Sequence, residues 1–278
     1  MATRTRSRKP RSFFDLLTEA INYFAEHGYT NRAELEAWVR RLRQAAVGYL
    51  PSNTSMETDI RRALTRSYTH LVTRGGLKSA NPAVSAFTID RLKPAMKAEL
   101  NRRIAASADL IKLNRQAAID DTLRRFQGWA TSVPAGGSDV VSKATEKVNV
   151  RKPLAKMDFI ARRCITDQTH KFAASVNAIV AEGGGAIAAV WHSPWRRPGY
   201  DYRKDHKERD EHVYLIRDSW ARKKGLVKPG DAGYTDQITA PGEEVYCSCK
   251  YQYLYGLDRL PTDMLTAAGR QAIALGKN

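Results

Sequence analysis

Residues 245–254 read VYCSCKYQYL, and this stretch decides the fold class of the C-terminal half of the chain. Polar and apolar residues alternate along it, which is typical of a half-buried β-strand, here one that carries Cys247 and Cys249. Two shorter apolar runs, AIAAVW at 186–191 and VYLI at 213–216, predict two further strands. Loops with Pro and Gly separate these runs, and a helical stripe of apolar residues precedes them. We therefore expect an α+β half in which a short irregular sheet, with a C-x-C strand, lies beside a helix.

The first 130 residues predict a helical N-terminal region. Apolar residues recur at spacings of three and four over residues 13–24, 35–42, 60–71 and from about 94 to 126. This spacing places the apolar side chains on one face of each helix, where they can form a core.

Residues 131–150 are predicted to be a linker. They contain Pro134 and Gly136 followed by polar and charged residues, a composition typical of a loop. The expected organisation is a helical region over 1–130, this linker, and an α+β domain over 151–278.

The composition indicates a folded and basic protein. Hydrophobic residues make up 42% of the 278, which is enough to bury a core and excludes wholesale disorder. No run approaches the ~20 consecutive apolar residues that a membrane-spanning helix needs, so no span is expected. Lys and Arg number 46 against 29 Asp and Glu, a formal net charge of +17. Such a charge attracts polyanions, so we expect sequence-independent contact with double-stranded DNA, or docking on an acidic protein surface. The N-terminal candidates for nucleic-acid or partner contact are Arg4, Arg6, Arg8, Lys9 and Arg11.

Cys247, Cys249 and His206 offer the ligands that a tetrahedral zinc site uses. Thiolate sulfur and imidazole nitrogen bind zinc, and an odd number of cysteines, three, does not indicate a disulfide framework. Alternate residues of a strand share a face, so both sulfurs can point the same way, although a single metal requires the strand to bend. His212 or Asp210 is the candidate fourth ligand of a structural zinc. The alternative is two half-buried strand residues beside a surface histidine.

The charged run RKDHKERDEH at 203–212 supports a second interpretation. Asp205, His206, Asp210 and His212 could together hold a hydrolytic metal, as in a metal-dependent nuclease or other hydrolase. A strip of alternating charges is more often a solvated surface, and no nucleophile with an orienting partner is evident nearby. We therefore expect no enzymatic activity. A metal-dependent hydrolase and a sequence-independent DNA-binding protein are the alternative functions.

An ordered set of short motifs over about residues 155–255 resembles a known family. The set is Ile160-Ala161-Arg162, Asp167-Gln168-Thr169, Asn177, Trp191, Arg203-x-x-His206, Asp210, Tyr214-Leu215-Ile216-Arg217, Lys228-Pro229-Gly230, Pro241-Gly242-Glu243 and Cys247-Ser248-Cys249. In this order and spacing it resembles the phage head morphogenesis (Mu F-like) family of minor capsid proteins. The residues that match the family's motifs are Arg162, Asp167, Gln168, Arg203, His206, Asp210, Cys247 and Cys249. The family often has Gly after its Asp, whereas Glu211 follows Asp210 here, which leaves the form of this turn open.

The resemblance implies a virion protein of a tailed phage, made in the cytoplasm of the bacterial host. Members of the family associate with the portal protein or the major capsid protein, at the portal or in the head interior. They act in head assembly, DNA packaging or DNA delivery. The resemblance also gives His206 and the two cysteines a shared setting, because Arg-x-x-His and Cys-x-Cys are recurring motifs of the family.

Overall fold

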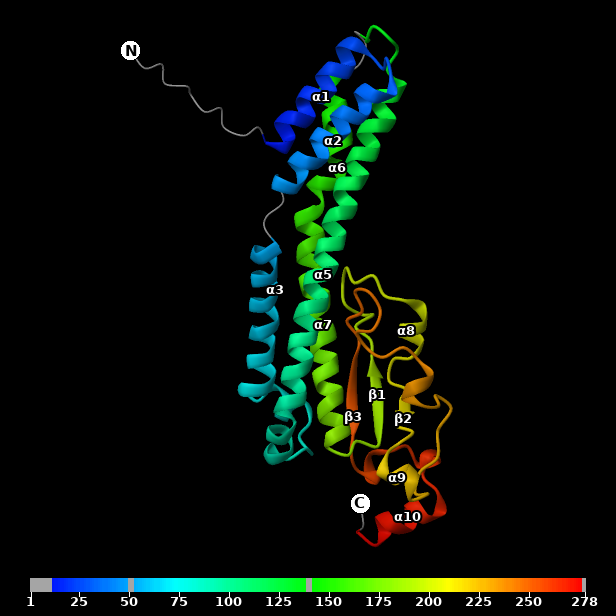
Figure 1. The fold of residues 1–278 in the computed structure, drawn as a ribbon. Helices are drawn as coiled ribbons and strands as arrows, with labels where there is room; N and C mark the ends of the chain where they lie inside the picture. Colours follow the sequence, from blue (N-terminus) through cyan, green and yellow to red (C-terminus); the bar gives the residue numbers. More distant parts are fainter. Residues whose placement is uncertain (1–11, 50–52, 139–141, 277–278) are drawn as a thin grey trace, which may run out of the picture. The chain divides into compact units, whose positions relative to one another are not determined.

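The computed structural model of the chain describes residues 12–49, 53–138 and 142–276. It has the predicted α+β class, with a helical N-terminal region and a small three-stranded antiparallel sheet (Figure 1). The chain divides into two compact units, each built from two separate stretches. As far as they are described, unit 1 comprises Met1–Thr58 with Ala108–Arg163, and unit 2 comprises Asp59–Ser107 with Cys164–Asn278.

Unit 1 is a set of helices packed around one apolar core. Its elements are α1 (Phe13–His27), α2 (Arg32–Tyr49) and α6 (Lys143–Ala155), with parts of α3 (Asn53–Tyr68), α5 (Ala86–Ser132) and α7 (Met157–Gly183). Ser12 begins α1 with a capping box: its hydroxyl accepts the Asp15 N–H, and the Asp15 carboxylate accepts the Ser12 N–H. The apolar stripes predicted from the sequence meet in the core, where Phe13, Phe24 and Phe126 are among the most deeply buried side chains.

The predicted linker over 131–150 is largely taken up by the ends of two helices. α5 continues to Ser132, and α6 begins at Lys143. The turn between them is tied to the end of α1, because the Gly136 N–H donates to the His27 carbonyl at 2.9 Å. This segment therefore belongs to unit 1 and does not separate two domains.

The boundaries between the two units lie inside helices. The chain passes from one unit to the other within α3, α5 and α7. With 47 residues at 1.5 Å per residue, α5 is about 70 Å long, so one helix contributes residues to two units. The predicted division into 1–130 and 151–278 does not follow these units. A helical stripe shows which face is buried but not which core each turn of the helix joins.

Unit 2 combines helices with the small sheet. Its further elements, in chain order, are the π-helix η1 (Thr69–Thr73), α4 (Gly76–Ala80), β1 (Ala188–His192), α8 (Lys204–Glu208), β2 (Val213–Leu215), α9 (Trp220–Lys223), the 3₁₀-helix η2 (Thr235–Gln237), β3 (Lys250–Leu254), the 3₁₀-helices η3 (Leu257–Arg259) and η4 (Thr262–Met264), and α10 (Ala267–Ala274). The C-terminal part of α7 runs beside the sheet (Figure 1).

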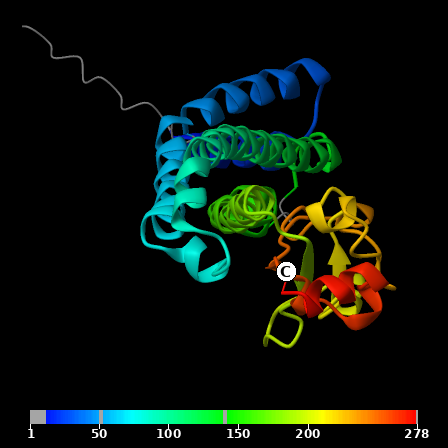
Figure 2. The same cartoon turned by 90° about the horizontal axis from the view of Figure 1, so that it is seen from below.

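The sheet has the order β2-β1-β3, with both pairs antiparallel. On the central strand, Val190 lies opposite Val213 on one side and Gln252 on the other. α7 contacts the outer strand β3, where the Asn177 amide donates to the Tyr251 carbonyl at 3.3 Å. Figure 1 shows α9 and α10 at one end of the strands, and Figure 2 views the structure from that end. A core shared by β1, β2, α9 and the segments after β3 fills this end; it consists of Ile187, Ala188, Leu215, Ala221, Val227, Leu257, Leu260, Met264 and Leu265.

Asn81 joins the two stretches of unit 2 to each other. It is fully buried, and its amide donates to Asn177 Oδ1 at 2.7 Å, while its own oxygen accepts the Tyr255 hydroxyl at 2.7 Å. Arg103 on α5 also donates to the Ser175 hydroxyl on α7 at 3.1 Å. The stretch 59–107 is therefore bonded into the same folded unit as the sheet.

The two neighbouring cysteines precede the third strand. β3 begins at Lys250, so Cys247 and Cys249 lie in the loop that leads into it. Tyr246 has a left-handed φ of +60°, and the Cys247 N–H donates to the Glu244 carbonyl, so the chain turns sharply just before the first cysteine. The prediction of a C-x-C strand is thus wrong at this point, because alternation of polar and apolar residues carries no signal for the turn.

In the described part of the chain, no helix has the length and apolar character needed to cross a bilayer.

Candidate metal centre

His206 lies on the short helix α8, within the segment that connects β1 to β2. Its side chain is buried with 1% of the residue exposed, an unusual position for an imidazole within a strongly charged run. The ring lies edge-on against Trp191, with ring centroids 5.2 Å apart. Burial of a polar ring is unfavourable unless its nitrogens have partners, so the surroundings of the two nitrogens decide what this residue does.

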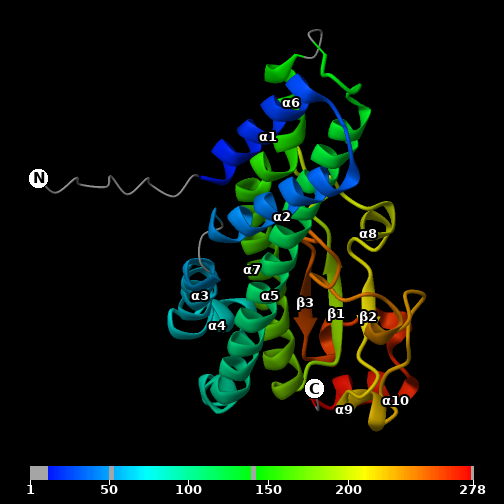
Figure 3. The ribbon, with the colours of Figure 1, turned by 45° about the horizontal axis from the view of Figure 1, so that its top comes forward.

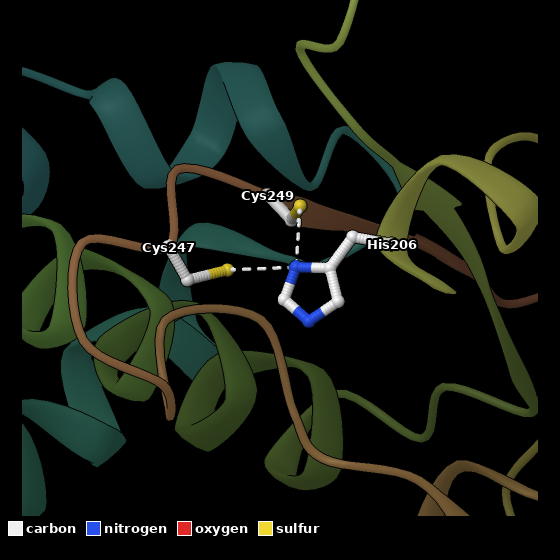
Figure 4. A group of neighbouring side chains, drawn as sticks. All are labelled: His206, Cys247 and Cys249. Carbon is white, nitrogen blue, oxygen red and sulfur yellow. Dashed lines mark hydrogen bonds between the residues drawn. The ribbon is translucent and has the colours of Figure 1, made fainter. Parts of the chain in front are cut away.

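Both cysteine sulfurs meet the same nitrogen of that ring (Figure 4). Cys249 Sγ lies 3.5 Å and Cys247 Sγ 3.7 Å from His206 Nδ1, and all three donor atoms lie within 4.8 Å of one another. For Zn–S bonds of about 2.3 Å and a Zn–N bond of about 2.0 Å, tetrahedral angles put nitrogen and sulfur about 3.5 Å apart. Both nitrogen–sulfur separations therefore match those of a zinc tetrahedron.

The two thiols share a proton in a way that favours a bound cation. The Cys249 thiol donates a hydrogen bond to Cys247, which lowers the pKa of Cys247 to about 5. The same bond, followed by burial, raises the pKa of Cys249 above its ordinary value. The Gly242 N–H also donates to Cys247 Sγ, at 3.4 Å. One thiolate thus forms readily, and the thiolate is the form of cysteine that binds metals.

The loop of the cysteines is held in place by side chains from distant parts of the chain. Asp167 on α7 accepts the Tyr246 N–H at 2.6 Å, so a buried carboxylate stabilises the left-handed residue before Cys247. Arg203 donates to the Val245 carbonyl at 2.9 Å. Because these bonds fix the turn, the two sulfurs converge even though the cysteines are only two residues apart.

The second ring nitrogen of His206 faces carboxylates. Nε2 is buried without a hydrogen bond among the described residues, and the carboxylates of Glu244 and Asp205 lie 3.5 and 3.8 Å away. Each acid also forms an ion pair at 2.6 Å, Glu244 with Arg203 and Asp205 with Arg209. A carboxylate beside the free nitrogen of a metal-bound imidazole orients the ring and strengthens it as a ligand. Glu244 is a residue that sequence reasoning missed, although it precedes the cysteines by only three positions.

Two buried polar groups, Trp191 Nε1 and Ser193 Oγ, lie beside Cys249. Hydrogen bonding from both to the Cys249 sulfur counteracts the rise in its pKa. Donors of this kind suit a negatively charged sulfur or a ligand bound next to it. The donor set therefore fits a soft divalent cation such as Zn²⁺, with His206, Cys247 and Cys249 as ligands.

The candidate fourth ligands from the sequence, Asp210 and His212, do not join this group. Asp210 accepts the Ser193 N–H at 2.8 Å and the Trp195 indole N–H at 2.7 Å, so its carboxylate is used in closing a loop. The His212 side chain is exposed. Among the described residues, the His/Cys/Asp/Glu groups close enough to share an ion with His206 contain neither of them. These two expectations are wrong, because sequence proximity within a run does not tell which way a turn sends each side chain.

The residue after Asp210 has a strained backbone conformation. Glu211 has a left-handed φ of +68°, and its N–H donates to the Trp191 carbonyl at 2.8 Å. Glycine adopts this conformation without the strain that a side chain brings. Glu211 thus adopts a backbone conformation that glycine would accept more readily.

The hydrolytic set Asp205, His206, Asp210 and His212 is not assembled as a group. Only the first two lie together, and the third member of their cluster is Glu244. Of the other motif residues, Gln168 is buried on α7 and accepts from the Ser107 hydroxyl at 3.4 Å. Arg162 lies on the part of α7 that belongs to unit 1. The N-terminal candidates Arg4, Arg6, Arg8, Lys9 and Arg11 lie outside the described residues.

Comparison with known proteins gives no match: no family model, no curated protein and no solved structure is significantly similar to this chain.

Proposed function

We propose that this chain is a minor capsid or head morphogenesis protein of a tailed phage, and that unit 2 is closed by a structural zinc. In this proposal the protein is made in the host cytoplasm and enters the phage head. There it contacts the portal protein or the major capsid protein and lies beside double-stranded DNA, which it touches without reading sequence. It acts in head assembly, DNA packaging or DNA delivery, and it is not an enzyme.

One observation carries the proposal: motif residues far apart in the sequence converge on a single loop. Asp167, Arg203 and His206 all contact residues of the 244–249 loop, across sequence separations of about 40 to 80 residues. Motifs that matched the family only by chance would not be expected to lie together in the folded chain. The left-handed backbone at Glu211, where the family often has Gly, supports the same interpretation.

The charge of the chain suits this setting. Packaged DNA is a dense polyanion, and a protein with a net charge of +17 contacts it favourably through phosphates alone. A small sheet with a thin core also gains much from a metal, because the free energy of binding adds to that of folding. The zinc would be held by His206, Cys247 and Cys249, and its contribution would be to cross-link α8 to the loop before β3.

The position of the protein in an intact particle tests the proposal. Particles of the phage or prophage that encodes this chain should contain it in few copies, detectable by mass spectrometry and located near the portal or inside the head by cryo-electron microscopy. Particles that package DNA and infect normally without this chain would overturn the proposal. So would purified virions from which the chain is absent.

Metal analysis tests the zinc independently. We expect about one equivalent of zinc in protein purified without chelator, lost in Cys247→Ser but retained in Cys164→Ser, because Cys164 is buried elsewhere on α7. Well under half an equivalent in the unaltered protein would end the zinc assignment.

A further inference from the structure

A groove on unit 2 presents cations and hydroxyls outside the metal centre. It has a volume of about 670 Å³ and is bordered by the end of α3, by η1 and by α7. Figure 3 shows α3 beside α7. Two arginines, one histidine and four hydroxyl residues make up seven of its eight lining residues, and none of the eight is acidic. The residues that matter for the argument are Arg66, His70, Arg74, Ser67 and Thr169.

The basic residues of the groove follow one another along the chain. Arg66 on α3, His70 in η1 and Arg74, directly after η1, are spaced by four residues, and all three line the groove. The segment that carries His70 is a π-helical turn, a form that is rare and is frequently found at functional sites. Thr169 on α7 borders the opposite side.

The surrounding acids are already used by other cations. The stretch 59–107 contains ten Lys and Arg residues but only three acids. The ion pairs of those three acids are Asp59–Arg62, Asp90–Lys93, Glu99–Arg102 and Glu99–Arg103. No carboxylate of the described residues pairs with Arg66 or Arg74, and both side chains belong to exposed residues. The groove therefore keeps its positive charge.

We propose that this groove binds the phosphodiester backbone of double-stranded DNA, with Arg66 and Arg74 as the principal contacts. Guanidinium groups match phosphate oxygens in a bidentate way. The hydroxyls of Thr69 and Thr169 already donate to backbone carbonyls, so the hydroxyl donors for phosphate are those of Thr65 and Ser67, which carry no sequence information. The proposal rests on the proposed function for its biological setting beside packaged DNA, but its chemistry requires only the lining described above. The proposal assigns the DNA affinity of the chain mainly to this groove, whereas the net charge alone would not favour one surface over another.

The test compares two pairs of substitutions that remove the same charge. Arg66→Gln with Arg74→Gln alters the groove, whereas Arg61→Gln with Arg91→Gln removes two exposed cations of the same unit that do not line it. Binding of the full chain to a labelled 30-base-pair duplex is measured over a range of salt concentrations. The groove pair should bind about tenfold more weakly at ~0.1 M salt, and its slope of log Kd against log salt should be smaller by about 2. The control pair should lose twofold or less.

Equal losses in the two pairs would overturn the proposal, because binding would then follow net charge and not the groove. Circular dichroism and zinc content should be unchanged in both pairs. If the double variant misfolds, the single variants Arg66→Gln and Arg74→Gln decide the question by the same comparison, with about threefold losses expected for each.

Free inorganic phosphate tests the other source of the same chemistry. A phosphate ion that raises the Tm of the unaltered chain but not that of the groove pair, together with equal DNA affinities, would assign the groove to a small ion and overturn the DNA proposal. A groove pair that loses DNA affinity while the chain is absent from virions would leave this inference standing and refute the proposed function.

Discussion

Unit 1 and unit 2 are each stabilised internally by a different kind of interaction. Unit 1 has one continuous core of aliphatic and aromatic side chains from its helices. The regular spacing of apolar residues in the sequence predicts that core. Unit 2 has a short sheet with a smaller core, and much of its order comes from individual polar bonds and the His206 cluster. We therefore expect the stability of unit 1 to depend mainly on the buried volume of its side chains. The stability of unit 2 should depend mainly on individual hydrogen bonds and on metal binding.

Removal of metal should produce the largest difference in stability between the two units. If free zinc is present at about a thousand times its Kd, it stabilises the folded protein by about 4 kcal/mol, and a strong chelator removes that contribution. We expect a transition assigned to unit 2 to shift to lower temperature in calorimetry, with full recovery on addition of Zn²⁺. Cys247→Ser should show the lower transition from the start and no response to chelator. A chelator without effect on the unaltered chain would contradict this prediction.

A large-to-small change in unit 1 should act on stability alone. Leu42 is fully buried in the core of unit 1, so Leu42→Ala should reduce the free energy of unfolding by about 3 kcal/mol through lost burial and a cavity. Denaturant titration measures the loss, and zinc content should remain at the level of the unaltered protein. A change in the metal affinity of this variant would contradict the prediction, because it would show that the core of unit 1 influences the metal site of unit 2.

Glu244→Gln should weaken the metal site without removing a ligand. The carboxylate lies 3.5 Å from His206 Nε2, and loss of such a partner typically lowers metal affinity by about 10- to 100-fold. Competition with a chromophoric chelator measures the affinity. Glu208→Gln on the same short helix as His206 is the matched control and should leave the affinity unchanged. Equal affinities for Glu244→Gln and the unaltered chain would remove Glu244 from the centre.

The smallest effect should come from Glu211→Gly, and it should be stabilising. The left-handed φ of +68° strains any residue with a side chain, whereas glycine accepts it, so relief of the strain outweighs the greater freedom of glycine in the unfolded chain. We expect a gain of about 1 kcal/mol, measured by thermal unfolding. The exposed neighbour Glu208, which sits in a helix, should give the opposite sign when changed to Gly.

The sequence predicted those features that depend on repetition. The apolar stripes of α1, α2 and α5 predicted the helices and most of the core of unit 1. Short apolar runs predicted β1 and β2, and alternation predicted β3, although β3 begins only at Lys250. The order of motifs also predicted that His206 would meet the two cysteines, and the structure brings the three together.

Features set by single backbone conformations could not be predicted in this way. Nothing in the alternation of residues 245–254 signals the left-handed Tyr246 that moves both cysteines off the strand. The turn at Glu211 directs Asp210 to the Trp195 loop, so the expected fourth ligand is used elsewhere. Glu244 was missed because its role comes from a contact with His206, 38 residues earlier in the chain, which no local pattern encodes.

The bonds of Asn81 have a practical consequence for dividing the chain. A shortened protein that begins at residue 151, the start of the domain expected from the sequence, would contain all three described strands together with His206, Cys247 and Cys249. It would lack Asn81, however, and so leave Asn177 and the Tyr255 hydroxyl without their buried partner. Such a fragment should be insoluble or poorly ordered even when zinc is supplied, whereas adding residues 59–107 as a separate peptide should restore it. The smallest fragment expected to keep the sheet folded as in the intact chain therefore consists of two separate stretches of the sequence.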